Sequence, residues 1–275
     1  MTFSNKRGVA YTLAITFLGI VLLSLSLLIF NAAQSSQSQL VIFGATQKIY
    51  DLEQSIQETF AQAVVQKTTL RFSSTINSFT INETLPQNIS ALTDLYVKLE
   101  PDIERDFPAI SLDTSFFIEN KEFQFLPQGI SYIQESTSKI KIKAATGGSL
   151  NSVQGYNLTL IFPANITTCS SNVQEGNVLQ VAVKATSPGN SCIIPATSIQ
   201  QLELQMVSEG KNFQLTVDQN KELTLDSQAT AQSSLVVMIT PLTEYGHLEI
   251  PVVMETNESS IRYYRKTNLR VPLQP

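Results

Sequence analysis

The chain has 275 residues, of which 43% are apolar and only 15% charged, and its formal net charge is −5. This length is enough for one large domain or two modest ones, each with its own core. Low charge beside many Ser and Thr residues favours an extracytoplasmic domain over a cytosolic enzyme. Every acidic residue follows Lys6 and Arg7, so the rest of the chain is net acidic. That balance argues against a nucleic-acid partner, because such binding depends on neutralising phosphates.

The N-terminal third is dominated by Val9–Phe30, a segment without charged residues. At about 1.5 Å per residue it is long enough to cross a hydrocarbon core of roughly 30 Å. Lys6 and Arg7 stand on its N-terminal side, so the positive-inside rule puts residues 1–8 in the cytoplasm and the chain after Asn31 outside. We therefore predict a single-pass membrane protein with a transmembrane helix over 9–30 and the lipid bilayer as partner. The alternative is a cleaved secretory signal, although the apolar segment exceeds the roughly 7–15 residues typical of one.

Lys6-Arg7-Gly8 directly before a long apolar segment resembles the leader of archaeal type IV pilin-like surface proteins. The resemblance covers about residues 1–65. It implies that a membrane peptidase cuts after Gly8, leaving Val9 as the new N-terminus, and that the helix takes part in self-assembly. Bacterial pilins carry Glu at the fifth mature position, where this chain has Leu13. The plain alternative is that Lys6 and Arg7 are the basic flank of a signal anchor.

Residues 31–66 continue a helical pattern beyond the predicted membrane segment. Apolar residues recur every seven positions and draw a stripe along one side of a helix. The stripe consists of Ile42, Ile49, Ile56 and Ala63. We predict an extracytoplasmic helical stalk, and the stripe has two interpretations: it is either the seam of an oligomer or the face on which the chain's own β domain packs.

Residues 67–275 have the pattern of a β-rich extracytoplasmic domain with one short helix near 90–107. Thr68–Ile81 favours the first strands, and Asn82–Gln87 is typical of a turn. From Ile140 onward, apolar and polar residues alternate in many short segments joined by short polar connections, which predicts an antiparallel meander. The fold class expected is therefore α+β: a long N-terminal transmembrane and stalk helix followed by an antiparallel β-sandwich-like domain.

Two cysteines, Cys169 and Cys192, lie close together in the β-rich part. An even number in a predicted extracytoplasmic domain fits one disulfide, with two free thiols as the alternative. Closing a loop of this length stabilises the fold by about 3 kcal/mol on the chain-entropy model. Five Asn-x-Ser/Thr sequons are candidate N-glycosylation sites, at Asn82, Asn88, Asn157, Asn165 and Asn257.

No residue pattern indicates catalysis, a metal site or a cofactor. The one histidine, His247, has no nucleophile motif near it and is expected on the outer face of a strand. The acidic residues Glu100, Asp102, Glu104 and Asp106 lack the glycine of a calcium loop and are interpreted as a solvated helix end. We expect a membrane-anchored, cell-surface structural or interaction protein that is not an enzyme, with a pilin-like subunit as one version. The alternative is a membrane-tethered module that does not polymerise and binds a glycan or a protein; the sequence does not name the ligand.

Overall fold

The computed structural model describes residues 5–145, 149–241, 246–258 and 263–273, without the side chains of 5–16, 18–21, 32–41 and 272. Its contacts divide the chain into two compact units. One unit is Met1–Gln54 with Ser259–Tyr263, and the other is Ser55–Glu258 with Tyr264–Pro275. We call the second one the β unit. The boundary falls between Gln54 and Ser55, so the last turns of the N-terminal helix belong to the β unit.

Three α-helices are described. They are α1 (Asn5–Lys67), α2 (Ser90–Asp106) and α3 (Ser115–Asn120). Helix α2 is the helix predicted near 90–107, and it continues through Pro101 to Asp106. Within the β unit, Phe60 of α1 and Tyr96 of α2 have ring centroids 4.5 Å apart, and the Tyr96 hydroxyl donates a hydrogen bond to the Phe60 carbonyl oxygen at 3.0 Å. Both residues are fully buried. The last turns of α1 are therefore held by α2.

Most of the β unit is a single hydrogen-bonded sheet. Its order is β1-β2-β12-β7-β8-β9-β10-β11-β6-β5-β4-β13-β14, and β3 pairs with β13. The strands are β1 (Arg71–Ser74), β2 (Ser78–Leu85), β3 (Ile110–Asp113), β4 (Glu122–Leu126), β5 (Ile130–Gln134), β6 (Lys139–Ala144), β7 (Val153–Ile161), β8 (Ile166–Thr186), β9 (Ser191–Ser208), β10 (Lys211–Val217), β11 (Leu223–Ser227), β12 (Ala231–Ile239), β13 (His247–Glu258) and β14 (Tyr263–Pro272).

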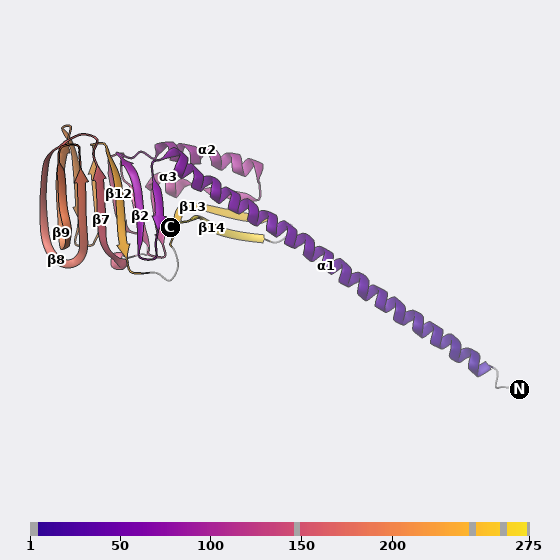
Figure 1. Cartoon of the computed structure of the whole chain (residues 1–275). Helices are drawn as coiled ribbons and strands as arrows, with labels where there is room; N and C mark the ends of the chain where they lie inside the picture. Colours follow the sequence, from indigo (N-terminus) through magenta and orange to yellow (C-terminus); the bar gives the residue numbers. More distant parts are fainter. Residues whose placement is uncertain (1–4, 146–148, 242–245, 259–262, 274–275) are drawn as a thin grey trace. The chain divides into compact units, whose positions relative to one another are not determined.

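The sheet folds back on itself through its two longest strands, β8 and β9 (Figure 1). The two strands pair along their whole length, yet Asn165 at the start of β8 accepts a hydrogen bond from the backbone of Gly189, just past its end, at 2.8 Å. A straight strand of this length would separate its ends by roughly 65 Å. Both strands must therefore turn back together, and the continuous sheet becomes two facing layers.

The local sequence explains how the pair turns. Glu175 and Leu179 of β8 are both in register with Ile199 of β9, so three residues of β8 are inserted at the bend. Because β8 takes the outer path round the bend, it needs these extra residues. Gly176 lies at this point, and a Cβ there would come within 2.8 Å of the Gln200 Cβ. The close approach of the two strands thus requires glycine.

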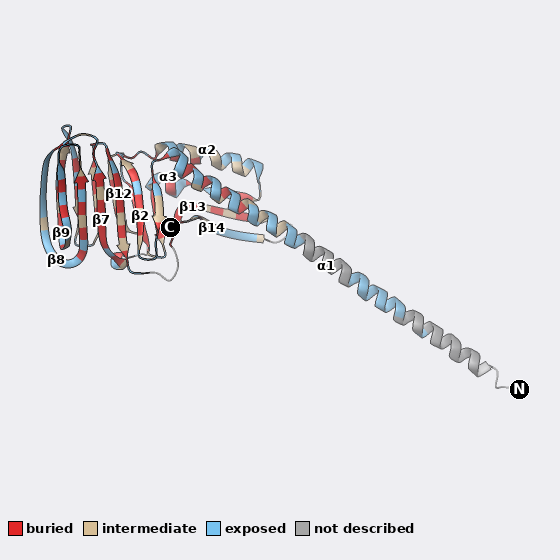
Figure 2. Ribbon diagram, viewed as in Figure 1, coloured by how far each residue is buried: buried red, intermediate tan, exposed pale blue. Residues whose placement is uncertain are grey.

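The core lies between the two layers. Alternate residues of most strands are buried, as the banding in Figure 2 shows. Aromatic rings join the layers at both ends of the unit: Phe79 of β2 stacks on Phe125 of β4 with centroids 4.0 Å apart, and Phe162 after β7 meets Phe213 of β10 edge-on at 5.7 Å. Because the sheet folds back, the apolar face of each layer is buried against the apolar face of the other.

The predicted fold class is wrong. More residues lie in strands than in helices, and the strands form one sheet instead of the separate sheets of a β-sandwich. Alternation along single strands cannot reveal that β8 and β9 bend and keep the hydrogen bonding continuous.

The structure does not bear out the predicted transmembrane character of the N-terminal helix either. Among the described residues, no helix contains a segment long and apolar enough to cross a membrane. Much of the predicted segment Val9–Phe30 lies outside the described side chains, and the described apolar stretch, Leu22–Phe30, is shorter than the roughly 20 residues that a crossing helix needs.

Two local predictions also differ from the structure. Asn82–Leu85, expected to be a turn, is the second half of β2, in which Glu83 takes a buried position that an apolar residue normally fills. Strand β7 pairs in parallel with the second half of β8, although an antiparallel meander was expected. One of the expected short polar connections is a hairpin turn between β9 and β10, in which Glu209 and Gly210 both have positive φ, as two-residue hairpins of this type require.

Candidate functional site

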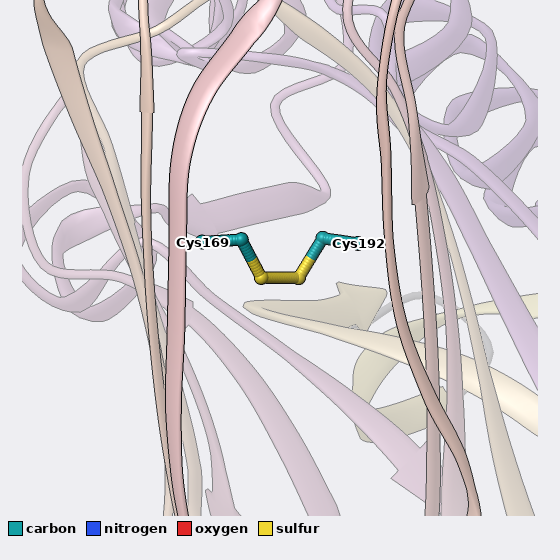
Figure 3. Close-up of a disulfide and its surroundings, with 2 residues drawn as sticks. All are labelled: Cys169 and Cys192. Carbon is teal, nitrogen blue, oxygen red and sulfur yellow. A yellow bond between two sulfur atoms is a disulfide. The ribbon is translucent and has the colours of Figure 1, made fainter.

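The predicted disulfide is confirmed. Cys169 lies in the first half of β8 and Cys192 at the start of β9, with Cα atoms 6.1 Å apart. Figure 3 shows the two side chains meeting between strands. Cys169 is exposed, whereas Cys192 is buried. Since these two segments belong to opposite layers, the bond fastens the layers together within the β8–β9 pair, away from its bend.

A shallow polar depression lies on the outside of β2, β12 and β7, with a volume of about 280 Å³. Most of the residues that line it carry hydroxyl or amide side chains. They include Thr69, Asn82, Thr84, Thr159, Gln232 and Ser234. A second depression shares Thr69 and Thr84 with it and extends along Lys67, Gln87 and Asn88. Neutral donors and acceptors of this kind suit a hydroxyl-rich ligand.

A carboxyl group is buried behind this depression. Glu83 of β2 points into the core and accepts a hydrogen bond from the Tyr132 hydroxyl of β5 at 2.7 Å, so the pair joins the two layers. Burial raises the pKa of Glu83 to about 7, although the bond from Tyr132 lowers it in part. Burial and the neighbouring Glu83 also raise the pKa of Tyr132. Across the strand, Ser233 is in register with Glu83, and its hydroxyl is buried without a partner among the described residues.

The five sequon asparagines are all exposed: Asn82, Asn88, Asn157, Asn165 and Asn257. The Asn82 side chain lies at the polar depression, and Asn165 holds the turn after β8 through its hydrogen bond to Gly189. The hydroxyl residue of the Asn257 sequon, Ser259, is outside the described residues. Glycosylation of the exposed asparagines remains a prediction.

The four residues of the seven-residue stripe on α1 differ in how far they are buried. Ile56 and Ala63 are each 4% exposed and pack within the β unit. Ile42 is 46% exposed and Ile49 is half-buried. The C-terminal half of the stripe is thus a packing face for the chain's own β unit, and the N-terminal half is only partly covered.

The apolar part of α1 exposes large side chains in every direction. They are Phe17, Leu22, Leu23, Leu25, Leu27, Leu28, Ile29 and Phe30, each at least 54% exposed. Ordinary monomeric proteins do not display such a continuous apolar surface to water. The predicted processing site, Gly8 and Val9, lies outside the described side chains.

Two of the four acidic residues of α2, Glu100 and Glu104, bond to the segment that follows the helix. Glu104 accepts hydrogen bonds at 3.0 Å from the Ser111 hydroxyl and the Leu112 amide of β3, and Glu100 accepts one from the Thr114 hydroxyl. Asp102 and Asp106 both pair with Arg105. Among the described residues, no group of three or more His, Cys, Asp and Glu side chains could hold a metal ion. The interpretation of the cluster as a solvated helix end therefore missed its role in tying α2 to β3.

His247 is less exposed than its alternation pattern predicted. It is half-buried at the start of β13, and its Nε2 is enclosed without a partner among the described residues. Burial and the nearby Arg270 lower its pKa. The histidine is thus kept neutral, and no nucleophile is seen to bond to it in the described part of the chain.

Comparisons with known proteins identify no relative. No family model, no curated protein and no solved structure matches the chain. The functional argument therefore depends on the chain's own surfaces.

Proposed function

We propose that this is a surface-displayed structural or interaction protein, attached to a lipid bilayer through its apolar N-terminal segment and presenting the β unit on the outer side. The observation that carries the proposal is the exposed apolar surface of α1 from Leu22 to Phe30. Transferring its seven large side chains out of water is worth roughly 10 kcal/mol. The disulfide and the low charge of the β unit support an extracytoplasmic position.

Flotation of the full-length chain with phosphatidylcholine vesicles tests the attachment. We expect the wild type to float, and the variant Leu23→Glu/Leu27→Glu to remain at the bottom of the gradient. The matched control is Ile42→Glu/Tyr50→Glu, which changes exposed residues of α1 outside the apolar segment and is expected to float. Equal flotation of both variants contradicts the proposal.

The pilin-like version of this function is tested separately by the mature N-terminal residue. Mass spectrometry of the protein from its native membrane is expected to find Val9 first if a peptidase cuts after Gly8. An intact leader removes the pilin-like version and leaves the bilayer attachment untouched.

A second candidate, a membrane-tethered module that binds glycans, is favoured by the hydroxyl- and amide-lined depression on β2, β12 and β7. Titration with a panel of neutral oligosaccharides tests it. Binding that is lost in Gln232→Ala and kept in Gln214→Ala, an exposed glutamine on β10, supports this function. Absence of binding across the panel rejects it.

A further inference from the structure

A sheet edge is a row of unpaired N–H and C=O groups, and proteins normally protect such rows. The described pairings leave several strand edges open. They are the outer edges of β1, β3 and β14, the segment Ser191–Ile199 of β9, and the first half of β8. We compare how each one is protected.

Four of these edges carry recognisable protection. Strands β1 and β3 have only four residues each. Strand β14 carries Arg265, Lys266 and Arg270, and basic side chains discourage the approach of another strand. The β9 segment contains Pro195, which cannot donate a backbone hydrogen bond.

The first half of β8 has no such protection between Thr168 and Gln174. We call this segment the β8 edge. Its sequence, Thr-Cys-Ser-Ser-Asn-Val-Gln, contains no charged residue, proline or glycine. It keeps an unbroken register with Val207–Gln201 of β9, so it is regular over seven residues. Every residue of it except Val173 is exposed.

The β8 edge is also fixed in place. Cys169 lies within it and is bonded to Cys192 in the opposite layer, while the other side of the strand is paired with β9. An edge that is already extended and held at both sides loses little conformational entropy when another strand is added. It is therefore prepared for strand addition.

We propose that the β8 edge pairs with the β8 edge of a second copy of this chain, antiparallel and about a two-fold axis at Ser171. In this register Ser170 faces Asn172 of the second copy and Cys169 faces its Val173. No like charges meet, because the segment has none. One two-fold contact covers both open edges at once and closes the assembly as a dimer. This inference is independent of the bilayer attachment, since all its residues belong to the β unit.

The test is the association of the full-length chain in detergent micelles, measured by light scattering over a range of concentrations. The variant Ser170→Lys/Asn172→Lys puts lysine opposite lysine twice across the two-fold axis, and we expect dimerisation to weaken by at least about tenfold. Both changed residues are exposed, so folding is preserved. The matched control, Ala196→Lys/Ser198→Lys, changes exposed residues on the open edge of β9 and is expected to dimerise like the wild type.

A charge-swapped partner makes the test specific to a second copy. Ser170→Asp/Asn172→Asp alone is expected to be monomeric, and an equimolar mixture with the lysine variant is expected to restore a dimer containing one of each. In the wild type, backbone amides of the β8 edge should exchange hydrogen more slowly as concentration rises, while those of Ser191–Ile199 should not change. A monomeric wild type, undiminished association of the lysine variant, or a mixture that forms no mixed dimer overturns the proposal. Loss of vesicle flotation in the apolar-segment variants does not affect it.

Discussion

Two segments of the same helix contrast in how their apolar residues are arranged. In Ser55–Lys67 the apolar residues lie on one side, and Ile56, Phe60, Ala63 and Val64 are buried in the β unit. In Leu22–Phe30 nearly every residue is apolar, and each large apolar side chain is at least 54% exposed in the described part of the chain. Apolar side chains on one side of a helix are buried when a single neighbouring element packs against that side. Apolar side chains all round a helix are buried only when the helix is surrounded by apolar groups. The first segment therefore serves the fold, and the second is the segment for which we propose attachment to a bilayer.

The largest effect that separates the two segments is expected from Phe60→Ala. Phe60 is fully buried against Tyr96, so its truncation leaves a cavity and lowers the free energy of unfolding of the β unit by about 3–5 kcal/mol. The control Leu27→Ala, in the exposed segment, should change this free energy by less than about 0.5 kcal/mol. Denaturant unfolding in detergent, followed by near-UV circular dichroism, measures both. A similar loss of unfolding free energy in the two variants would contradict the distinction between the two segments.

The next effect concerns the buried carboxyl group of the β unit. Because the pKa of Glu83 is raised from 4.5 to about 7, its contribution to stability is fully present below about pH 4.5 and is lost as the pH rises through 7. The expected loss is about 3 kcal/mol. Glu83→Gln should remove this decline and be more stable than the wild type above pH 7. Unfolding midpoints from pH 4.5 to 8 measure it, with Glu255→Gln, in an exposed ion pair with Lys266, as the control that keeps the decline. A wild-type stability that does not fall over this range would show that Glu83 ionises freely in the folded protein.

The disulfide joins the first half of β8 to the start of β9, which lie in opposite layers of the β unit. Changing Cys169 and Cys192 together to serine is expected to lower the free energy of unfolding by about 3 kcal/mol, because the open loop regains entropy in the unfolded chain. Thermal unfolding of the variant and of the oxidised wild type gives the difference. The oxidised wild type, denatured without reductant, should contain no free thiol; two titratable thiols would mean that the bond does not form.

A smaller effect is expected at the contact between α1 and α2. Tyr96→Phe removes the hydroxyl that donates to the Phe60 carbonyl oxygen but keeps the ring packing. The loss of one buried hydrogen bond should cost about 1 kcal/mol. Denaturant unfolding detects it, and Tyr264→Phe, in which the hydroxyl removed belongs to an exposed side chain, is the control. A null result at Tyr96 would indicate that the last turns of α1 are held by ring packing alone.

Local patterns in the sequence predicted part of this fold. Alternation located many of the strands, the helix expected near 90–107 is α2, and the spacing of two cysteines identified the disulfide. The prediction of a turn at Asn82–Gln87 was wrong because the carboxyl group of Glu83, in a core position, interrupts the apolar alternation that marks a strand. The prediction of separate sheets was wrong because β8 and β9 bend together. That bend arises from the pairing of the two strands and not from the sequence of either one alone.

The candidate surfaces were even less visible in the sequence. The polar depression gathers Thr69, Thr159 and Gln232 from distant parts of the chain, and no local motif joins them. The β8 edge has an ordinary sequence, and only the strand order shows that one of its sides is open. The sequence offers one indication of this open edge, the absence of charged residues between Thr168 and Gln174. That absence is informative only by comparison with the strand edges that carry charged residues or proline.

The central claim is that Leu22–Phe30 lies in lipid and that the exposed residues further along α1 do not. Nitroxide labels at Leu25→Cys and Tyr50→Cys in the full chain, reconstituted in phosphatidylcholine vesicles, test it through collision with oxygen and with a water-soluble nickel complex. The account predicts that the label at 25 collides mainly with oxygen and the label at 50 mainly with nickel. Equal access of the nickel complex to both positions would contradict it.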